Sequence, residues 1–242
     1  MSILHIRLGI MVLLLGLPGL CLAEQEHFVA AQIGGAFPSN KVKLFWHDGV
    51  GGTGDIKYKK GKDRLGSSVL YNAVIGKKVY DSTYLEAEIA YAEHKFDKQT
   101  LSKTPVRDLT DFLKTKARVV TFFANLSYRL DKLQKTTAKG MKFTPYIAFG
   151  LGASLNRMGR TDNKDSDGEQ EILPGAIKAT FAWQVGGGLL ISVRENIDVN
   201  MSYKYRDLGG IKSGKCPLLG NKPHVHGRLH TSNVLVGLSY KF

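Results

Sequence analysis

The side chains best suited to binding a metal are one thiol and three imidazoles near the C-terminal end, at Cys216, His224, His226 and His230. Thiolate sulfur and imidazole nitrogen are ligands that Zn²⁺ and Cu²⁺ prefer in proteins. The group has no second cysteine and no regular ligand spacing, both of which structural zinc sites usually show. The pattern therefore does not predict a bound metal, and we expect no cofactor.

Two further patterns are typical of ion or nucleotide sites. Four acidic residues lie close together at Asp162, Asp165, Asp167 and Glu169, but their spacing departs from the EF-hand loop that binds Ca²⁺. The segment Gly49–Gly54 matches the pattern G-x-G-x-x-G. A dinucleotide site needs a strand before this pattern and a helix after it, and here the flanking sequence is polar. Loop flexibility is a sufficient explanation for the glycines, so we predict neither site.

Catalysis by a nucleophile needs a histidine within hydrogen-bond reach, oriented by a third group. His94 is the strongest candidate for such a base, since it lies inside a segment of alternating polarity. No serine that would lie beside it can be identified. We therefore predict that the protein is not an enzyme, and a lipid-modifying enzyme that uses His94 is a remote alternative.

Four charged residues interrupt otherwise apolar or small-residue segments, at Glu86, Glu88, Lys204 and Arg206. A charge that is removed from water is costly unless it has a partner of opposite sign. If the four share an interior, we expect the two glutamates to pair with the lysine and the arginine. The alternative is that they lie near an open end of the fold and are hydrated.

The first 23 residues have the pattern of a secretory signal, with a basic start, an apolar run and a small residue at its end. We expect cleavage after Ala23, which leaves residues 24–242 as a single domain. The alternative, a lipoprotein signal with Cys21 lipidated, conflicts with the large Leu20 before it. Only Cys216 then remains, so no internal disulfide forms, and export without disulfides fits a bacterial envelope.

The composition is that of a folded, basic protein. The chain has 242 residues, of which 43% are hydrophobic, and a formal net charge of +13. Apart from residues 8–22, no stretch approaches the roughly 18 uncharged apolar residues of a membrane helix. Any further membrane span must therefore be made of β-strands.

Alternation with a period of two residues recurs along the chain and predicts strands. In residues 143–155, for example, Ile147, Phe149 and Leu151 alternate with the small Ala148 and its neighbours. Eight segments show the pattern, over residues 29–37, 69–75, 85–91, 116–130, 143–155, 179–193, 197–206 and 234–242. An even number of such segments is typical of a small outer-membrane barrel.

The connections between these segments alternate in length. Long polar connections cover residues 38–66, 97–115, 156–178 and 209–229, and tight ones cover residues 80–82 and 194–196. The connection after the fourth segment, residues 131–142, is long for a turn.

A soluble lipocalin-like barrel is the alternative. In such a barrel the apolar face points inward, whereas here charged residues share a face with glycines and aromatic residues fill the other face. We therefore predict an all-β, eight-stranded antiparallel transmembrane β-barrel with four long external loops.

Four segments carry a family resemblance, namely Thr144–Gly152, Phe181–Gly188, Tyr203–Gly209 and Val236–Phe242. Together, in this order, they resemble the opacity-protein and OmpA-type surface-antigen barrels of Gram-negative bacteria. The resemblance covers essentially the whole mature chain, although no single segment is specific.

This resemblance implies an integral protein of the bacterial outer membrane that contacts outer-membrane lipid and lipopolysaccharide. It also implies insertion by the barrel-assembly machinery, which would read the C-terminal strand with Leu238, Tyr240 and Phe242. The sequence ends at this strand, so we expect no periplasmic peptidoglycan-binding domain of the kind that full-length OmpA carries.

The interior of an eight-stranded barrel is just wide enough for side chains to fill it, so we expect function in the loops. The first loop has seven basic and three acidic residues, and the fourth has four basic and no acidic residues, a net charge of +4 for each. The basic surface that we predict consists of Lys57, Lys59, Lys60, Lys62, Arg64, Lys212, Lys215, Lys222 and Arg228.

Charge attraction would let this surface hold lipopolysaccharide phosphates, a host-surface receptor or an acidic polysaccharide. We therefore predict a surface antigen that supports envelope integrity and host contact, with no nucleic-acid partner. One alternative is a narrow pore for small solutes or ions. Another is that the loop charges are merely solvated.

Overall fold

The computed structural model describes residues 26–39, 41–44, 63–95, 116–138, 140–159, 161–164, 170–173, 175–212, 214–216, 222–223 and 225–242. The expected signal segment, residues 1–23, lies outside the described residues. Within the described part of the chain, none of the helical structure is long and apolar enough to cross a membrane.

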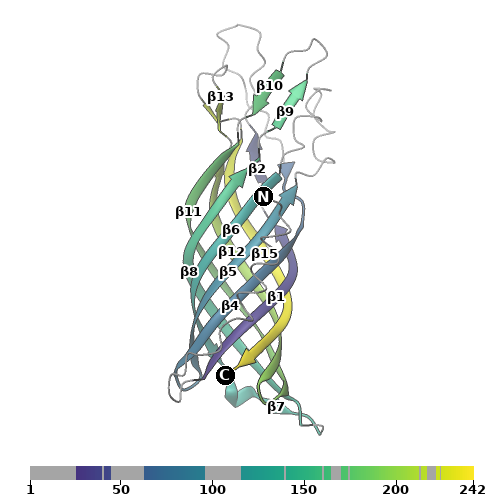
Figure 1. Cartoon of the computed structure of the whole chain (residues 1–242), viewed down its shortest axis with the longest axis vertical. Helices are drawn as coiled ribbons and strands as arrows, with labels where there is room; N and C mark the ends of the chain where they lie inside the picture. The colour runs from purple at the N-terminus through teal and green to yellow at the C-terminus, as the bar shows by residue number, and fades with distance from the viewer. Residues whose placement is uncertain are drawn as a thin grey trace.

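Eight long strands form a closed barrel in which every neighbouring pair is antiparallel (Figure 1). The strands are β1 (His27–Pro38), β4 (Ser68–Tyr80), β5 (Thr83–Lys95), β6 (Lys116–Arg129), β8 (Lys142–Met158), β11 (Ala176–Arg194), β12 (Ile197–Lys212) and β15 (Val225–Lys241). Consecutive long strands pair with one another, and β1 pairs with β15 to close the sheet. The predicted eight-stranded antiparallel barrel is confirmed.

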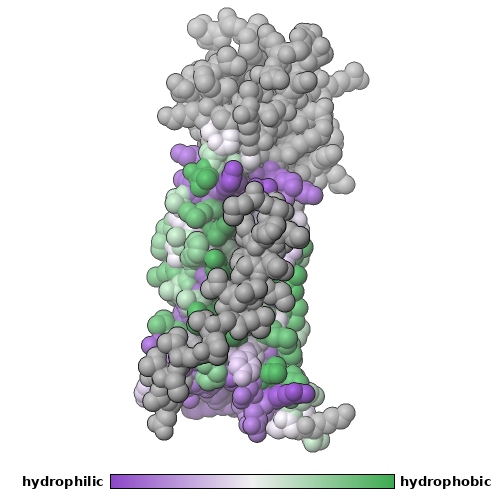
Figure 2. Space-filling model, viewed as in Figure 1, coloured by the Kyte–Doolittle hydropathy of each residue, from purple (hydrophilic) through white to green (hydrophobic). Residues whose placement is uncertain are grey.

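The alternation of the sequence determines which side chains point outward. Along β6, for example, Phe122, Leu126 and Tyr128 are exposed on the outer wall, whereas Phe123 and Asn125 are buried in the lumen. Figure 2 shows the result on one face, an apolar wall with hydrophilic residues at its upper and lower borders. An exposed apolar band of this kind is the surface that a lipid-embedded barrel needs.

The strands continue further at the upper end than the sequence predicts. Strand β8 ends at Met158 and β12 at Lys212, and pairs of short strands follow β1, β8 and β12. These are β2 (Lys41–Leu44), β3 (Asp63–Arg64), β9 (Thr161–Lys164), β10 (Gln170–Leu173), β13 (Lys215–Cys216) and β14 (Lys222–Pro223). The boundaries expected from alternation were wrong here. Backbone pairing continues above the apolar band, where the outward side chains no longer need to be apolar, so alternation is lost before the strand ends.

The lower end contains the two tight turns that the sequence predicts, after β4 and after β11. The longer connection, residues 131–142, contains the 3₁₀ helix η1 (Asp131–Leu133) and β7 (Lys135–Thr136), which pairs with β8. Residues 27 and 242, near the two ends of the barrel sheet, are joined by reciprocal backbone hydrogen bonds at this end. Both ends of the barrel sheet therefore lie below, and the long connections lie above.

One irregularity changes which residues enter the lumen. The pairing of β12 with β15 shifts register between Asp207 and Gly210, and Gly209 has a positive φ of 68°. The side chain of Asn156 donates hydrogen bonds to the carbonyl oxygens of Leu208 (2.8 Å) and Gly210 (3.0 Å). Leu208 continues the inward face of Lys204 and Arg206, and beyond the bulge the inward face passes to Ile211, so both side chains are buried.

Candidate functional site

A network of charged and amide side chains fills the middle of the lumen. Glu88 on β5 lies between two cations of β12: Lys204 Nζ is 2.6 Å from Glu88 Oε2, and Arg206 Nη2 donates to Glu88 Oε1. The exposed fractions of Glu88, Lys204 and Arg206 are 3%, 5% and 1%. The carboxylate and its two partners are thus removed from water together.

Two amides complete the hydrogen bonding of this network. Asn125 on β6 and Gln184 on β11 each donate to Glu88 Oε2, over 2.8 Å and 3.0 Å. Gln184 also accepts a bond from Arg206 Nε over 2.8 Å. A buried ion pair is tolerable only when the remaining donors and acceptors are also satisfied, and the amides do this. Neither amide carried a signal in the sequence beyond being polar at an inward position.

Glu86 does not join this network. It lies two residues lower on β5, about 7 Å along the strand, and accepts a hydrogen bond from Ser127 over 2.5 Å. It forms no ion pair with a described residue. The structure therefore brings one of the two glutamates, Glu88, against Lys204 and Arg206, and leaves Glu86 bonded to a hydroxyl.

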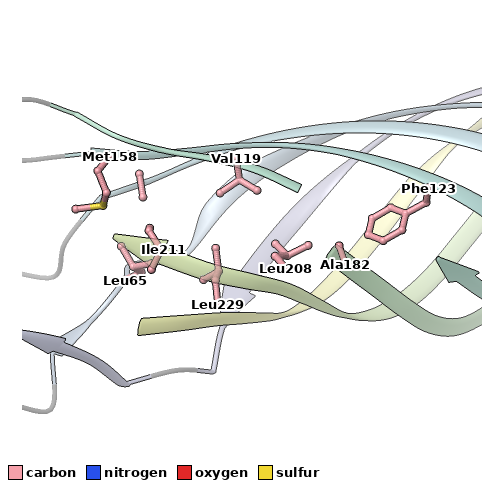
Figure 3. Close-up of a cluster of buried hydrophobic side chains, with 9 residues drawn as sticks. Leu65, Val119, Phe123, Met158, Ala182, Leu208, Ile211 and Leu229 are labelled. Carbon is pink, nitrogen blue, oxygen red and sulfur yellow. The ribbon is translucent and has the colours of Figure 1, made fainter. Parts of the chain in front are cut away.

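Apolar side chains fill the lumen above the network (Figure 3). The cluster, which we call the apolar plug, consists of Leu65, Ala117, Val119, Phe123, Met158, Ala182, Leu208, Ile211 and Leu229, each at most 3% exposed. The Arg206 guanidinium lies 5.6 Å from the centre of the Phe123 ring, so the plug and the network are in contact. Among the described residues, the side chains of the plug and the network thus occupy this part of the lumen together.

A small cavity lies between the plug and the network, with room for about one water molecule. His94 and Thr121 line it, and His94 Nε2 and Thr121 Oγ1 have no hydrogen-bond partner among the described residues. The other ring nitrogen, His94 Nδ1, lies 3.1 Å from the carbonyl oxygen of Gly66. His94, the strongest catalytic candidate of the sequence, is fully buried, and its ring contacts the backbone of Gly66, next to Leu65.

The basic surface predicted for the loops is described only in part. Lys57, Lys59, Lys60 and Lys62 lie outside the described residues, and the side chains of Arg64, Lys215 and Lys222 are likewise not described. Lys212 is exposed. Arg228 is exposed and pairs with Asp207 over 2.7 Å.

The backbone brings the first and fourth loops together. Strand β2 of the first loop pairs with the upper end of β15, where Lys43 is opposite His226 and Leu44 is opposite Val225. The two loops that carry the basic residues are therefore neighbours at the upper rim.

Most side chains of the two metal-site patterns lie outside the described part of the chain. No group of three or more potential ligands occurs among the described residues. His224, Asp165, Asp167 and Glu169, together with the glycine-rich residues 49–54, lie outside them. His230 lies on the outer wall, stacked on Tyr205 with ring centres 6.1 Å apart.

The residues expected to direct assembly lie on the outer wall at the lower end. Leu238, Tyr240 and Phe242 are all exposed, and the rings of Tyr240 and Phe242 stack with centres 6.4 Å apart. Their role in recognition by the barrel-assembly machinery stays a prediction.

An ion pair at the lower rim makes a prediction about pH. Glu26 accepts hydrogen bonds from Arg129 (3.0 Å) and Tyr84 (2.9 Å). Burial alone would raise the pKa of Glu26, but the positive charge of Arg129 and the two hydrogen bonds outweigh it and hold this pKa below its ordinary value of 4.5. The ionised carboxylate therefore stabilises the barrel fully above about pH 4.5, and this stabilisation is lost as the pH falls through the folded-state pKa.

We expect acidification from about pH 6 to about pH 3 to destabilise the natural protein more than the variant Glu26→Gln. Urea-unfolding midpoints across this range, in one detergent, measure the difference. The same pH dependence in both proteins would contradict it.

Comparison with known proteins agrees with this fold. The family model described as "Outer membrane protein beta-barrel domain" matches residues 12–242. Outer membrane protein PagN of Salmonella typhimurium is 28% identical over 133 residues, which is 54% of this chain and 52% of PagN. The chain thus spans about half the length of the curated relative that it matches.

Two solved structures share the fold at low sequence identity. OprG of Pseudomonas aeruginosa gives a TM-score of 0.54 at 16% identity, over 90% of this chain and 95% of OprG. The outer membrane protein AlkL, solved in DMPC lipid bilayers, gives 0.52 at 16% identity, over 94% of this chain and 95% of AlkL. The extent of the family match, together with the closed barrel and its apolar outer wall, leads to one conclusion: the chain is an outer-membrane protein that belongs to the outer membrane protein β-barrel domain family.

Proposed function

We propose that the barrel is a rigid, non-catalytic platform that presents its basic first and fourth loops to acidic polymers outside the cell. These polymers include lipopolysaccharide and the acidic polysaccharides or receptors of a host surface. The observation that carries the proposal is the pairing of β2 with β15, because it makes the two basic loops neighbours.

Adjacent loops of like charge attract a polyanion more strongly than separated ones. Each of the two loops carries a net charge of +4 in the sequence. At physiological ionic strength charges act over roughly 8 Å, so only neighbouring loops combine their fields. A polymer with many anionic groups can contact both loops at once, which multiplies weak individual attractions.

The filled lumen favours this function over the alternative of a narrow pore. The network around Glu88 and the apolar plug occupy successive levels of the barrel, and the cavity between them has room for about one water molecule. An ion would have to displace the plug or break the network. A rigid core of this kind suits a platform for loops.

The test is attachment of bacteria that display the protein to heparin-coated surfaces and to cultured animal cells. The variant Lys212→Gln/Lys215→Gln/Lys222→Gln removes three charges of the fourth loop. Each exposed ion pair contributes about 0.5 kcal/mol, so we expect binding to heparin to weaken about tenfold. Neutralising Lys57, Lys59, Lys60 and Lys62 should weaken it further, and salt should weaken the natural protein most.

The matched control removes three cations from the opposite end of the barrel, with Lys132→Gln/Lys135→Gln/Lys142→Gln. It should attach as the natural protein does, and protease cleavage of intact cells should show that the loops are exposed in each variant. Attachment that is independent of salt and unchanged by the loop variants would refute the proposal and favour a structural or narrow-pore role.

A further inference from the structure

A group of charged side chains lies on the outer wall, at the upper border of the apolar band. Glu93 on β5 is opposite Arg118 on β6, which in turn is opposite Arg157 on β8. Directly above, Lys95 is opposite Lys116. We call these five residues the wall cluster. Their neighbours Ala117 and Met158 are buried in the lumen, so the alternation of the strands directs the wall cluster outward.

The wall cluster has a surplus of positive charge. Glu93 is shared by two cations, with Lys116 Nζ 2.8 Å from Oε1 and Arg118 Nε 2.9 Å from Oε2. Lys95 and Arg157 are exposed, and neither forms an ion pair with a described residue. Four cations against one carboxylate leave a net charge of +3 on three adjacent strands.

The position of the wall cluster indicates what could neutralise it. Two residues lower on the same outward faces of β6 and β8, Val120 is opposite Leu155. Leu155 is exposed, as is Phe122 one step further down, so the wall below the cluster is the apolar band. The cluster therefore begins where hydrocarbon ends, at the level of the lipid headgroups. Because the long loops lie at this end, the headgroups are those of the outer leaflet.

We propose that the wall cluster binds the phosphate of an outer-leaflet lipid, with Arg157 and Lys95 as its main donors. The guanidinium of Arg157 offers paired N–H donors that match phosphate oxygens. Glu93 orients Lys116 and Arg118 beside it without cancelling the surplus charge. The apolar wall below holds the acyl chains of the same lipid, so one molecule satisfies both the charged and the apolar surface.

This inference rests only on the position of the barrel in the outer membrane. The wall cluster shares no residue with the basic loops, so the two proposals can fail separately. Attachment to heparin tests the loops, and binding of a detergent-solubilised lipid tests the wall.

The experiment uses the full protein extracted from outer membranes into a neutral detergent. Lipid A with both phosphates is titrated, and bound lipid is counted by native mass spectrometry while the unfolding temperature is followed. The variant Lys95→Gln/Arg157→Gln keeps both ion pairs of Glu93 and therefore the local structure. We expect it to bind lipid A about fivefold more weakly, as the loss of two charge contacts implies.

A matched control removes two exposed cations from the lower end of the barrel, with Lys77→Gln/Lys142→Gln. These lie on separate strands, β4 and β8, and should change the affinity for lipid A less than about twofold. An equal loss of affinity in both variants would overturn the site, since it would show attraction by net charge alone.

Two further ligands distinguish the source of the phosphate. Lipid A without phosphates should bind to the natural protein as weakly as phosphorylated lipid A binds to the variant Lys95→Gln/Arg157→Gln. If the natural protein binds the two lipids equally well, the role of phosphate is overturned. Inorganic phosphate at the same concentration should not raise the unfolding temperature. A rise equal to that caused by lipid A would show a site for a free anion instead of a lipid.

Discussion

Replacing Glu88 by glutamine is expected to lower the free energy of unfolding of the barrel by about 3–5 kcal/mol. The substitution keeps the size of the side chain and its hydrogen-bonding carbonyl, but it removes the negative charge. Lys204 and Arg206 then stay buried with no counter-ion in the network. Removing one partner of a buried ion pair leaves an uncompensated charge, which costs far more than the pair contributed.

Denaturant unfolding in detergent or lipid vesicles, followed by the electrophoretic shift of folded barrels, measures this loss. Glu86→Gln is the matched control, because Glu86 lies on the same face of β5 but is bonded to the Ser127 hydroxyl. Glu86→Gln replaces a charged hydrogen-bond acceptor by a neutral one, which should lower the free energy of unfolding by only about 1 kcal/mol. An unchanged unfolding midpoint for Glu88→Gln would show that water reaches the network and replaces the carboxylate.

A double substitution separates the stranded charge from other effects of the glutamine. Adding Lys204→Met to Glu88→Gln removes one of the two stranded cations and leaves Arg206 with its bond to Gln184. The double variant should therefore be more stable than Glu88→Gln alone. Additive losses would indicate that the two side chains are not coupled.

The second large effect is expected from a charge on the outer wall. Phe122 is exposed near the middle of β6, with Arg118 towards the upper border and Tyr128 towards the lower one. Arginine at the midplane of a bilayer-embedded barrel costs about 2–4 kcal/mol, because its charge must leave water. We therefore expect Phe122→Arg to lower the unfolding free energy by this amount in lipid vesicles.

Leu133→Arg is the control for this prediction. Leu133 is also an exposed apolar side chain, but it belongs to η1 in the lower connection, outside the apolar band. A surface substitution in water should change the stability by no more than about 0.5 kcal/mol. Similar losses for the two arginines would place Phe122 outside the hydrocarbon and contradict the assignment of the apolar band.

Alternation identified the face of each strand but not the ends of the strands. It correctly predicts that Glu88, Lys204 and Arg206 point away from lipid, since each shares a face with small residues. It does not predict where β8 and β12 end, because above the membrane both faces tolerate polar side chains. The bulge at Asp207–Gly210 then shifts the alternation by one residue, which is why Ile211 points into the lumen although Ser202, Lys204 and Arg206 would predict the opposite face for it.

Which side chains pair within the lumen depends on the register between strands, and the alternation of residues along one strand does not reveal that register. Glu86 and Glu88 have the same sequence signal, yet only Glu88 lies level with the cations of β12. Strands β5 and β12 are not neighbours in the sheet, and they face one another across the barrel. The tilt and stagger of a closed barrel decide which levels meet.

The class of the fold, the number of long strands and the face that each presents to lipid follow from the order of the amino acids alone. These properties are local, because a period of two residues directs successive side chains to opposite faces of any strand. Other features appear only once the barrel is closed: Glu88 becomes the shared counter-ion, and Leu65 from the first loop joins the apolar plug. In the same way the two basic loops become neighbours, and Arg157 comes to lie beside Arg118. These contacts join residues distant in sequence, and closure of the sheet creates them.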